Sequence, residues 1–382
     1  MLEPFEHDPR TRLVFGDGAI ARLGEIAREA GARRALLVTD PGIVKAGHAA
    51  RALERLAAAR VETAVFQDVE ENPSTIHVQA GLEAAREARI DSIIGLGGGS
   101  AMDCAKGINF LFTSGGSMKD YWGIGKARSP MLPLIAVPTT AGTGSESQSF
   151  ALISDPVTHQ KMACGDKRAA ARVALLDPEL TLTQPRLVAA ATGIDAISHA
   201  LETAVTRRRN PVSRAFSREA WHLLIGSFPR VLEAPGDLEA RGRMLLGASL
   251  AGAAIESSML GATHSAANPL TARYGTVHGH AIGVLLPRVV RFNAEVVGDD
   301  YAELLLLAGR EPRPGEPPGE ALARLLEEIL AATGLPRRLS ECGVEEGDLG
   351  ALSREATTQW TVQFNPRPVT EEDFLEIYRC AL

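Results

Sequence analysis

The sequence predicts two parts: an α/β part built on a doubly wound parallel sheet, followed by an all-α part. Three observations lead to this expectation. Short apolar runs alternate with helix-length segments in the first half of the chain. Strand-like runs disappear after Pro185, where alanine, leucine and glutamate recur at helical spacing. Two glycine-containing loops directly follow predicted strands. We therefore expect one domain over residues 1–185 and a second over residues 186–382.

Four apolar runs in the first domain have the length of buried strands, at residues 35–39, 61–66, 92–96 and 133–137. Segments of helical length separate them, at residues 43–58, 75–88 and 101–112. A helix between two such strands forms a right-handed crossover, which makes the strands parallel.

In the second domain, helical spacing is clear over residues 187–206, 211–232 and 238–267. Residues 311–320 (EPRPGEPPGE) are rich in proline and glycine. This composition predicts an exposed loop between helices.

The overall composition restricts the partners. The chain has 382 residues, of which 45% are hydrophobic, so it can bury a sizeable core. A formal net charge of −7 argues against nucleic acid or an anionic membrane held by bulk charge. The N-terminal sequence is charged, which is not typical of a signal peptide, and no run approaches the roughly 20 apolar residues of a membrane helix. Four scattered cysteines without a CxxC pair are typical of a reduced, cytoplasmic protein.

A glycine-rich loop is the first segment that suggests chemistry. Gly97, Gly98 and Gly99 follow a predicted strand and precede a predicted helix. Glycines let the backbone approach a phosphate closely, and the amides and dipole of a helix start favour an anion. The spacing is neither GxGxxG nor a Walker A loop. The alternative is a tight turn in which Ser100 is the helix N-cap and Asp103 completes a capping-box-like start.

A second polar loop, PTTAGTGSE, follows the next strand at residues 138–146. Open α/β sheets bind ligands at the carboxyl edge of their strands, so these hydroxyl groups can line a nucleotide groove. The alternative is an ordinary polar loop. The hydroxyl groups belong to Thr139, Thr140, Thr143 and Ser145.

Asp40 stands at the end of the first predicted strand. A carboxylate there can accept hydrogen bonds from an adenosine ribose and would repel a 2′-phosphate, which favours NAD over NADP. The alternative is an Asp-Pro-Gly turn with ordinary turn chemistry.

A set of one aspartate and three histidines suggests a metal site. Asp195 and His199 are four residues apart in a mostly apolar helical segment, so they share one helix face. His264 and His278 follow later in the chain. Three imidazoles and one carboxylate suit a borderline divalent ion such as Fe²⁺ or Zn²⁺. The alternative for the first pair is a satisfied aspartate–histidine contact in the core.

Taken together, these motifs resemble those of the iron-containing (group III) alcohol dehydrogenase family, over essentially the whole chain and in order. The matching segments are GLGGGSAMDCAK at 95–106, PTTAGTGSE at 138–146, ATGIDAISHALE at 191–202, GATHSAANPL at 261–270, HGHAIGVLLP at 278–287 and NPRPVT at 365–370. The resemblance implies the dehydroquinate synthase-like superfamily, with a Rossmann-like dinucleotide-binding domain, a helical metal domain, an active site between them and a homodimer.

The resemblance also implies roles for individual residues. The positions matching the family's metal ligands are Asp195, His199, His264 and His278. Those matching its pyrophosphate loop are Gly97, Gly98, Gly99, Ser100 and Asp103. Those matching the loop near the nicotinamide ribose and phosphates are Thr139, Thr140, Thr143 and Ser145. Further cofactor contacts match Asp40, Asn72 and Lys161.

One position departs from the family pattern. Many members carry a second histidine four residues after the third metal ligand, and here that residue is Asn268. An amide can orient a substrate or water but cannot titrate near neutral pH. Asn268 and, as a substitute proton carrier, His280 are therefore the candidate catalytic residues.

The sequence thus predicts a metal-dependent enzyme that transfers hydride between a nicotinamide cofactor and a small alcohol or aldehyde. Fe²⁺ is the expected metal with Zn²⁺ as the alternative, and NAD is the expected cofactor with NADP as the alternative. The competing enzymes are a zinc polyol dehydrogenase and an oxo-acid reductase of the maleylacetate type. A nucleotide-binding scaffold without activity is the competing non-enzymatic function.

Overall fold

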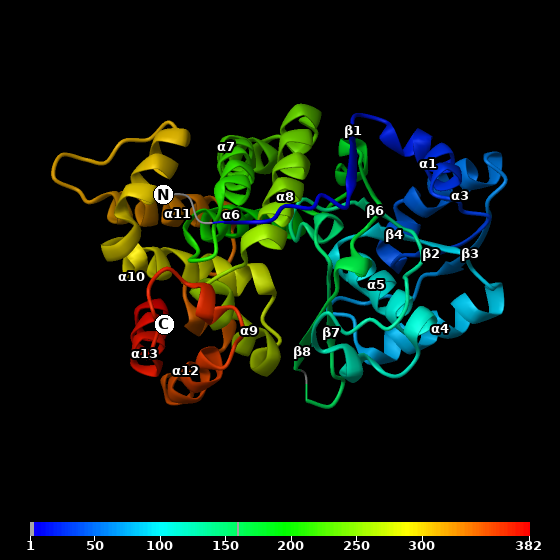
Figure 1. Ribbon diagram of the computed structural model, residues 1–382. Coiled ribbons are helices and arrows are strands. Elements are labelled where there is room, and N and C mark those ends of the chain that lie inside the picture. The colour runs from blue at the N-terminus through cyan, green and yellow to red at the C-terminus, as the bar shows by residue number, and fades with distance from the viewer. Residues whose placement is uncertain (1–3, 159) are drawn as a thin grey trace. The chain divides into compact units, whose positions relative to one another are not determined.

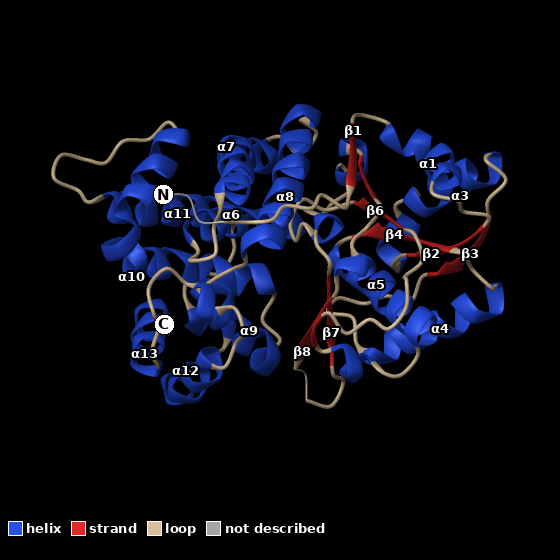
Figure 2. Cartoon of the chain, in the orientation of Figure 1, coloured by secondary structure: helices blue, strands red, loops and turns tan. Residues whose placement is uncertain are grey.

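The strands in the described part of the chain, residues 4–158 and 160–382 of this computed structural model, all lie before residue 177 (Figures 1 and 2). Backbone contacts also divide the chain. The sheet unit is Asp8–Gln184, and the helical unit is Pro185–Leu382 with residues 4–7. The predicted fold class, a parallel α/β part followed by an all-α part, is confirmed.

The sheet unit is built on six strands in the order β1-β9-β6-β4-β2-β3, and every neighbouring pair is parallel. Four of these strands lie within one residue of the predicted ones. The sequence does not predict the other two, β1 and β9, because four residues are too few to show a period. The six are β1 (Arg12–Phe15), β2 (Arg34–Val38), β3 (Glu62–Phe66), β4 (Ser92–Gly97), β6 (Leu134–Pro138) and β9 (Val173–Leu176).

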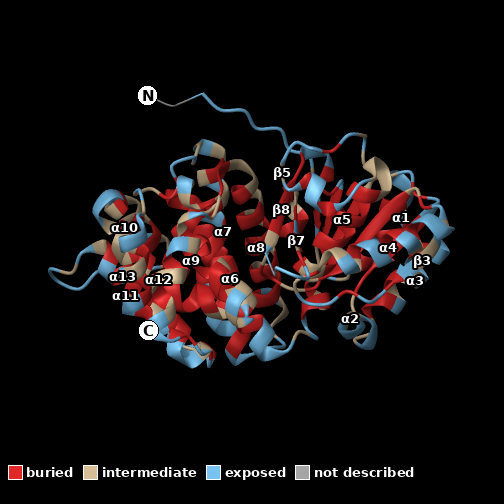
Figure 3. Ribbon diagram, turned by 90° about the horizontal axis from the view of Figure 1, so that it is seen from below, coloured by how far each residue is buried: buried red, intermediate tan, exposed pale blue. Residues whose placement is uncertain are grey.

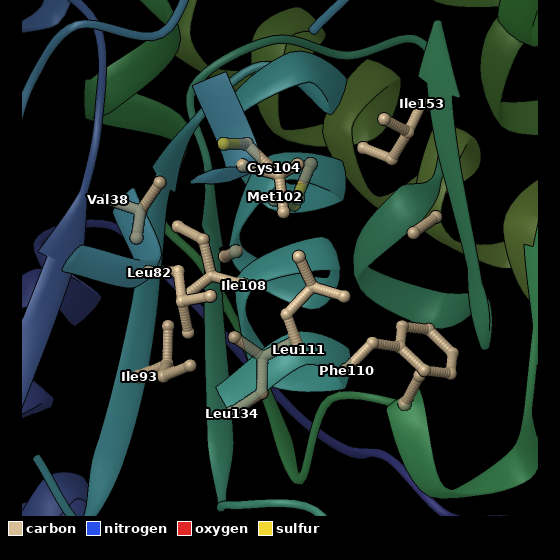
Figure 4. Close-up of a cluster of buried hydrophobic side chains, with 14 of the residues drawn as sticks. Val38, Leu82, Ile93, Met102, Cys104, Ile108, Phe110, Leu111, Leu134 and Ile153 are labelled. Atoms are coloured by element: carbon tan, nitrogen blue, oxygen red, sulfur yellow. The ribbon is translucent and has the colours of Figure 1, made fainter. Parts of the chain in front are cut away.

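Helices cover both faces of this sheet, and alternate strand residues enter the two cores. On β2, Leu37 packs in one core with Leu56. Val38 packs in the other with Leu82 and Ile108 (Figure 4). The first core is covered by α1 (Leu23–Glu29) and α3 (His48–Ala58), and the second by α4 (Thr75–Ala88) and α5 (Gly99–Ser114).

One predicted helix of this unit is wrong in extent. Residues 43–58 form two helices, α2 (Pro41–Lys45) and α3, because Gly47 between them has a φ of 84°. A left-handed residue ends one helix before the next begins.

A second, three-stranded sheet in the same unit is not predicted. Its order is β5-β8-β7, with β5 parallel and β7 antiparallel to β8. The strands are β5 (Gly123–Ile124), β7 (Phe150–Ser154) and β8 (Lys161–Gly165).

The helical unit contains eight α-helices among the described residues: α6 (Arg186–Val205), α7 (Pro211–Glu233), α8 (Leu238–Ser258), α9 (Ala262–Tyr274), α10 (His278–Leu307), α11 (Pro318–Thr333), α12 (Leu349–Thr357) and α13 (Glu371–Ala381). α6 is buried along most of its length, and buried residues fill the interior of this unit (Figure 3). The first two helices match the predicted segments. The loop expected at 311–320 is mostly exposed, and α11 begins inside it at Pro318.

The prediction of a single helix over residues 238–267 is wrong. α8 ends at Ser258, Met259 has a φ of 96°, and α9 leaves at an angle of 105°. The bend makes His264 the third residue of a new helix rather than a residue in the middle of a long one.

In the described part of the chain, no single helix has both the length and the apolar composition needed to cross a membrane. The bent pair formed by α8 and α9 meets that criterion only when the two helices are taken together.

Candidate active site

The strand order gathers three polar segments at one edge of the main sheet. β6, β4 and β2 are consecutive neighbours, so the residues after their carboxyl ends lie side by side. A Cβ atom on Gly97 would lie 3.2 Å from Asp40 Oδ2, and one on Gly98 would lie 3.4 Å from Thr140 Oγ1. A Cβ on Gly99 would come within 2.6 Å of the Thr143 side chain. Glycine is therefore needed at Gly99 for the two predicted loops to pack together.

Two threonine hydroxyls at this edge have no hydrogen-bond partner among the described residues. They are Thr39 Oγ1 at the end of β2 and Thr139 Oγ1 at the end of β6, and both residues are at most 2% exposed. A buried hydroxyl without a partner is costly. Sequence reasoning chose Thr139 but missed Thr39.

Asp40 uses its two carboxylate oxygens differently. Oδ1 accepts a hydrogen bond of 3.0 Å from the Ile43 amide and caps α2. Oδ2 is the oxygen that faces Gly97. The turn interpretation of this residue is therefore correct for one oxygen, while the other lies beside the glycine loop.

Asp103 and Ser145 are bonded to each other, with Ser145 Oγ donating to Asp103 Oδ1 over 2.6 Å. Lys106, which is fully buried, donates to Ser145 O and Oγ over 2.7 Å each and to Phe150 O over 2.8 Å. Burial raises the pKa of Asp103, and Lys106 opposes this shift. These contacts fasten the second polar loop to α5 and β7.

The other predicted cofactor residues lie at varied positions. Ser100 is the second residue of α5, whose N-cap is Gly98, so the alternative in which Ser100 is the N-cap is wrong. Asn72 lies after β3 with a φ of 54°. Lys161 opens β8 opposite Ser154, and its charge acts on Asp103.

The predicted metal ligands converge within the helical unit. Asp195 and His199 lie on α6, His264 on α9 and His278 on α10. Asp195 Oδ1 lies 3.4 Å from His199 Nε2, 3.5 Å from His264 Nε2 and 3.8 Å from His278 Nε2. In the tightest group, of Asp195, His199 and His264, all ligand atoms lie within 4.8 Å of one another. His278 is more peripheral, with a side chain that is 25% exposed.

These residues fit a divalent metal ion. Ligand atoms bound at about 2.1 Å in a tetrahedron lie roughly 3.4 Å apart, close to the 3.4–3.8 Å that separate Asp195 Oδ1 from the three imidazole nitrogens. Asp195 Oδ1 and His264 Nε2 are buried and have no hydrogen bond among the described residues, although they lie 3.5 Å apart. A metal ion would satisfy two such neighbouring atoms, and one carboxylate with imidazoles suits Fe²⁺ or Zn²⁺.

Electrostatics favour an ionised carboxylate at this centre. Burial would raise the pKa of Asp195, but the imidazoles, His199 first, outweigh it and hold the pKa well below its usual range. For His264, burial lowers the pKa, but Glu202 and Asp195 dominate and raise it to about 9.

Glu202 is a buried carboxylate of this centre to which sequence reasoning gives no role. Its Oε2 accepts a hydrogen bond of 2.6 Å from His264 Nδ1, and the residue is 4% exposed. The sequence carries a signal for it, because positions 195, 199 and 202 follow the i, i+4, i+7 spacing of one helix face. The contact between Glu202 and His264 has no such signal, because the two residues are 62 positions apart in the sequence.

The two candidate catalytic residues differ in placement. Asn268 lies one helical turn after His264 on α9, and its Nδ2 donates to Gln359 Oε1 over 3.0 Å. His280 is two residues after His278 on α10, roughly 200° around the helix. Its imidazole therefore leaves α10 on a different side from that of His278.

Comparison with known proteins agrees with this geometry. A family model described as iron-containing alcohol dehydrogenase matches residues 9–178, and one for the C-terminal part of Fe-containing alcohol dehydrogenases matches residues 189–382. The chain is 33% identical to the NAD-dependent methanol dehydrogenase of Bacillus methanolicus, with 97% of each chain covered. It is 34% identical to the 1,3-propanediol dehydrogenase of Citrobacter freundii, with 96% of each covered. A solved 1,3-propanediol oxidoreductase superposes with a TM-score of 0.96 at 33% identity and full coverage of both chains.

Proposed function

The chain belongs to the iron-containing alcohol dehydrogenase family, and from this premise we propose that it interconverts small alcohols and aldehydes with NAD(H). The convergence of Asp195, His199, His264 and His278 on one point carries the proposal. We assign nucleotide binding to residues 1–185 and metal binding to residues 186–382. A bound Fe²⁺ or Zn²⁺ would act there as a Lewis acid toward the alcohol or carbonyl oxygen.

The residues of the sheet unit bind and orient the nucleotide in this proposal. The glycines at 97–99 let the backbone amides at the start of α5 approach the pyrophosphate. Thr139, Thr140 and Thr143 supply hydroxyls beside it, and Asp40 Oδ2 accepts a hydrogen bond from a ribose. Ser100, Asp103, Ser145, Asn72 and Lys161 remain in the proposed cofactor set.

Asn268 is proposed to orient the substrate, because its amide group is held by Gln359 and cannot carry a proton. His280 is the proposed proton carrier in its place. Measuring kcat against pH for Asn268→Ala and His280→Ala separates the two roles. Loss of rate without a change in the pH profile is expected for the first, and a changed profile for the second.

The test of the function begins with protein made anaerobically with iron. Metal content is measured, and NADH absorbance is followed with primary alcohols, diols and aldehydes, including methanol and 1,3-propanediol because two relatives bear those names. His264→Ala should lose metal and activity together and keep its helical circular dichroism. His222→Ala, an exposed histidine of α7, is the matched control and should keep both.

Full activity in metal-free His264→Ala protein would contradict the proposal. Binding of NAD⁺ and metal without turnover of any compound would instead indicate a nucleotide-binding scaffold. We also propose a homodimer, from the family resemblance, and a cytoplasmic location, from the scattered cysteines. Light scattering coupled to gel filtration tests the dimer.

A further inference from the structure

Glu202 connects the candidate metal centre to the start of α9. Its Oε2 accepts the hydrogen bond from His264 Nδ1, and its Oε1 accepts one of 2.7 Å from the Thr263 amide. We propose that Glu202 is a positioning residue that fixes the tautomer and ring orientation of His264, and that Asn365 near the C-terminus completes this support. The inference rests on the proposed metal centre.

The hydrogen bond between Glu202 and His264 decides which ring nitrogen of His264 is available to bind a metal ion. A neutral imidazole has one N–H donor and one acceptor nitrogen. In the neutral form that binds a metal ion, the proton is held on Nδ1 because a carboxylate can only accept, and Nε2, which lies 3.5 Å from Asp195 Oδ1, is the nitrogen left to bind the ion. A carboxylate behind a ligating imidazole also increases the basicity of that ligand.

The same residue fixes the backbone that carries His264. The first amides of a helix have no acceptor within the helix, and Gly261, the N-cap of α9, has no side chain to supply one. Instead, Glu202 accepts from the Thr263 amide, and Asn365 Oδ1 accepts from the Ala262 amide over 3.2 Å. The start of α9 is therefore capped by side chains distant in sequence.

Asn365 is itself held in a single orientation. Its Nδ2 donates to Asn293 Oδ1 over 2.7 Å and to Arg367 O over 2.7 Å. Asn293 Nδ2 donates back to Asn365 Oδ1 over 3.1 Å, and both asparagines are at most 2% exposed. This arrangement leaves Asn365 Oδ1 correctly placed for α9, and it gives a physical role to the first residue of the NPRPVT segment.

The space around Gly261 shows how closely these groups meet. A Cβ atom there would lie 2.9 Å from Asn365 Oδ1 and 3.2 Å from Glu202 Oε1. The two supporting side chains therefore converge on the residue that precedes α9, which leaves little freedom for the position of His264.

The experiment measures Zn²⁺ affinity at neutral pH by competition with a fluorescent chelator, using full-length protein stripped of metal. Glu202→Gln keeps the shape of the side chain but removes its charge and allows an amide to donate to Nδ1. It should weaken Zn²⁺ binding about 10–100-fold, the usual effect of removing such a partner. Asn365→Ala leaves Glu202 in place and should weaken binding by a smaller factor.

Asp177→Asn is the matched control, because Asp177 is a fully buried carboxylate that accepts hydrogen bonds from the Gly18, Ile20 and Glu179 amides in the sheet unit. It should lower the melting temperature and leave Zn²⁺ affinity unchanged. A purely structural Glu202 would behave in the same way, so wild-type Zn²⁺ affinity in Glu202→Gln overturns the inference. If Glu202→Gln does not fold, wild-type affinity in Asn365→Ala overturns it. A wild-type protein that binds no Zn²⁺ would overturn the metal centre itself, and this inference with it.

Discussion

The two carboxylate oxygens of Asp40 lie beside different groups, the start of a helix and the glycine loop. Oδ1 bonds to the Ile43 amide, whereas Oδ2 lies beside Gly97. An asparagine can keep the capping acceptor while removing the charge. Substitution can therefore separate the structural function of this residue from its proposed function in cofactor selection.

We predict that the parent enzyme prefers NAD(H) and that Asp40→Asn shifts the preference toward NADP(H) by roughly a hundredfold in relative affinity. The reason is the loss of repulsion between the carboxylate and a 2′-phosphate. The measurement is kcat/KM with both cofactors. Asp40→Ala should shift the ratio equally and also destabilise the protein by about 1 kcal/mol through the lost cap. An unchanged ratio in both variants would leave Asp40 only its capping function.

Individual residues of the candidate site can be predicted from the sequence where they lie close together along the chain. Asp195 and His199 are predicted as neighbours because four residues on one helix suffice. The contact of Glu202 with Thr263 depends on how α6 and α9 pack, over 61 residues of sequence, and nothing local encodes it. Lys106 is a further example, because its carbonyl partner Phe150 lies 44 residues away.

At the scale of helices, the start of α10 is pressed against α6. A Cβ atom on Gly279, the residue after His278, would lie 2.2 Å from the Ala191 carbonyl oxygen. Backbone cannot yield as a flexible side chain can, so α10 must move to accept even one methyl group.

Gly279→Ala is therefore expected to destabilise the protein by about 1–3 kcal/mol, the usual cost of overpacking, and to weaken metal binding by displacing His278. The control is Gly226→Ala in α7, an exposed helical position with nothing within 4 Å of the added atom. It should stabilise by about 0.5–1 kcal/mol, because alanine favours a helix over glycine. Urea unfolding and Zn²⁺ titration of both variants provide the comparison, and equal stability of the two would refute the packing argument.

The loop before α11 contains a carboxylate whose contribution to the stability of the protein depends on pH. Glu316 accepts hydrogen bonds from Arg324 on α11 and from the Arg313 amide, and these interactions lower its pKa from 4.5 to about 2. Folding thus favours the ionised form. This stabilisation is fully present above pH 4.5 and is lost as the pH falls toward 2.

We predict that Glu316→Gln melts at a lower temperature than the parent at neutral pH and that the difference narrows between pH 4.5 and pH 2. Glu311→Gln, in the same exposed loop, is the control because Glu311 makes no ion pair among the described residues. Its melting temperature should follow the parent at each pH. A Glu316→Gln difference that stays constant with pH would show that ionisation of this residue does not contribute.

Helix boundaries follow the sequence where local capping residues set them. α4 covers the predicted residues 75–88, because Ser74 and His77 form a capping box at its start and Arg89 is left-handed at its end. The break after α8 is not predicted, because the apolar spacing continues through residues 259–261 and the groups that hold the new helix start, Glu202 and Asn365, come from elsewhere.

For the whole molecule, the two proposed ligands belong to different units. The four candidate metal ligands all lie within residues 195–278 of the helical unit. Asp40 and the glycine loop lie within residues 40–99 of the sheet unit. A ligand that binds only the folded state stabilises what it contacts, by about 2.7 kcal/mol at a hundred times its Kd.

Hydrogen exchange followed by mass spectrometry should therefore show separate protection. Zn²⁺ should slow exchange in peptides from α6, α9 and α10, and NAD⁺ should slow it in peptides covering residues 95–106 and 138–146. His264→Ala should lose the first effect and keep the second. Protection of the glycine loop by Zn²⁺ alone, with none in α6, would contradict the assignment of ligands to units.

The pairing of β1 with β9 also affects how the chain folds while it is being made. Val14 is in register with Leu175. The ribosome must therefore add about 160 further residues before the partner of the first strand has been made. At 5–20 residues per second, a ribosome needs roughly 8–30 s for that stretch. During this time the three apolar residues of the RLVF segment have no partner strand, and an unpaired strand edge can promote aggregation. The charged residues directly before it, in the segment HDPRT, are the kind that protect such a strand until synthesis reaches residue 176.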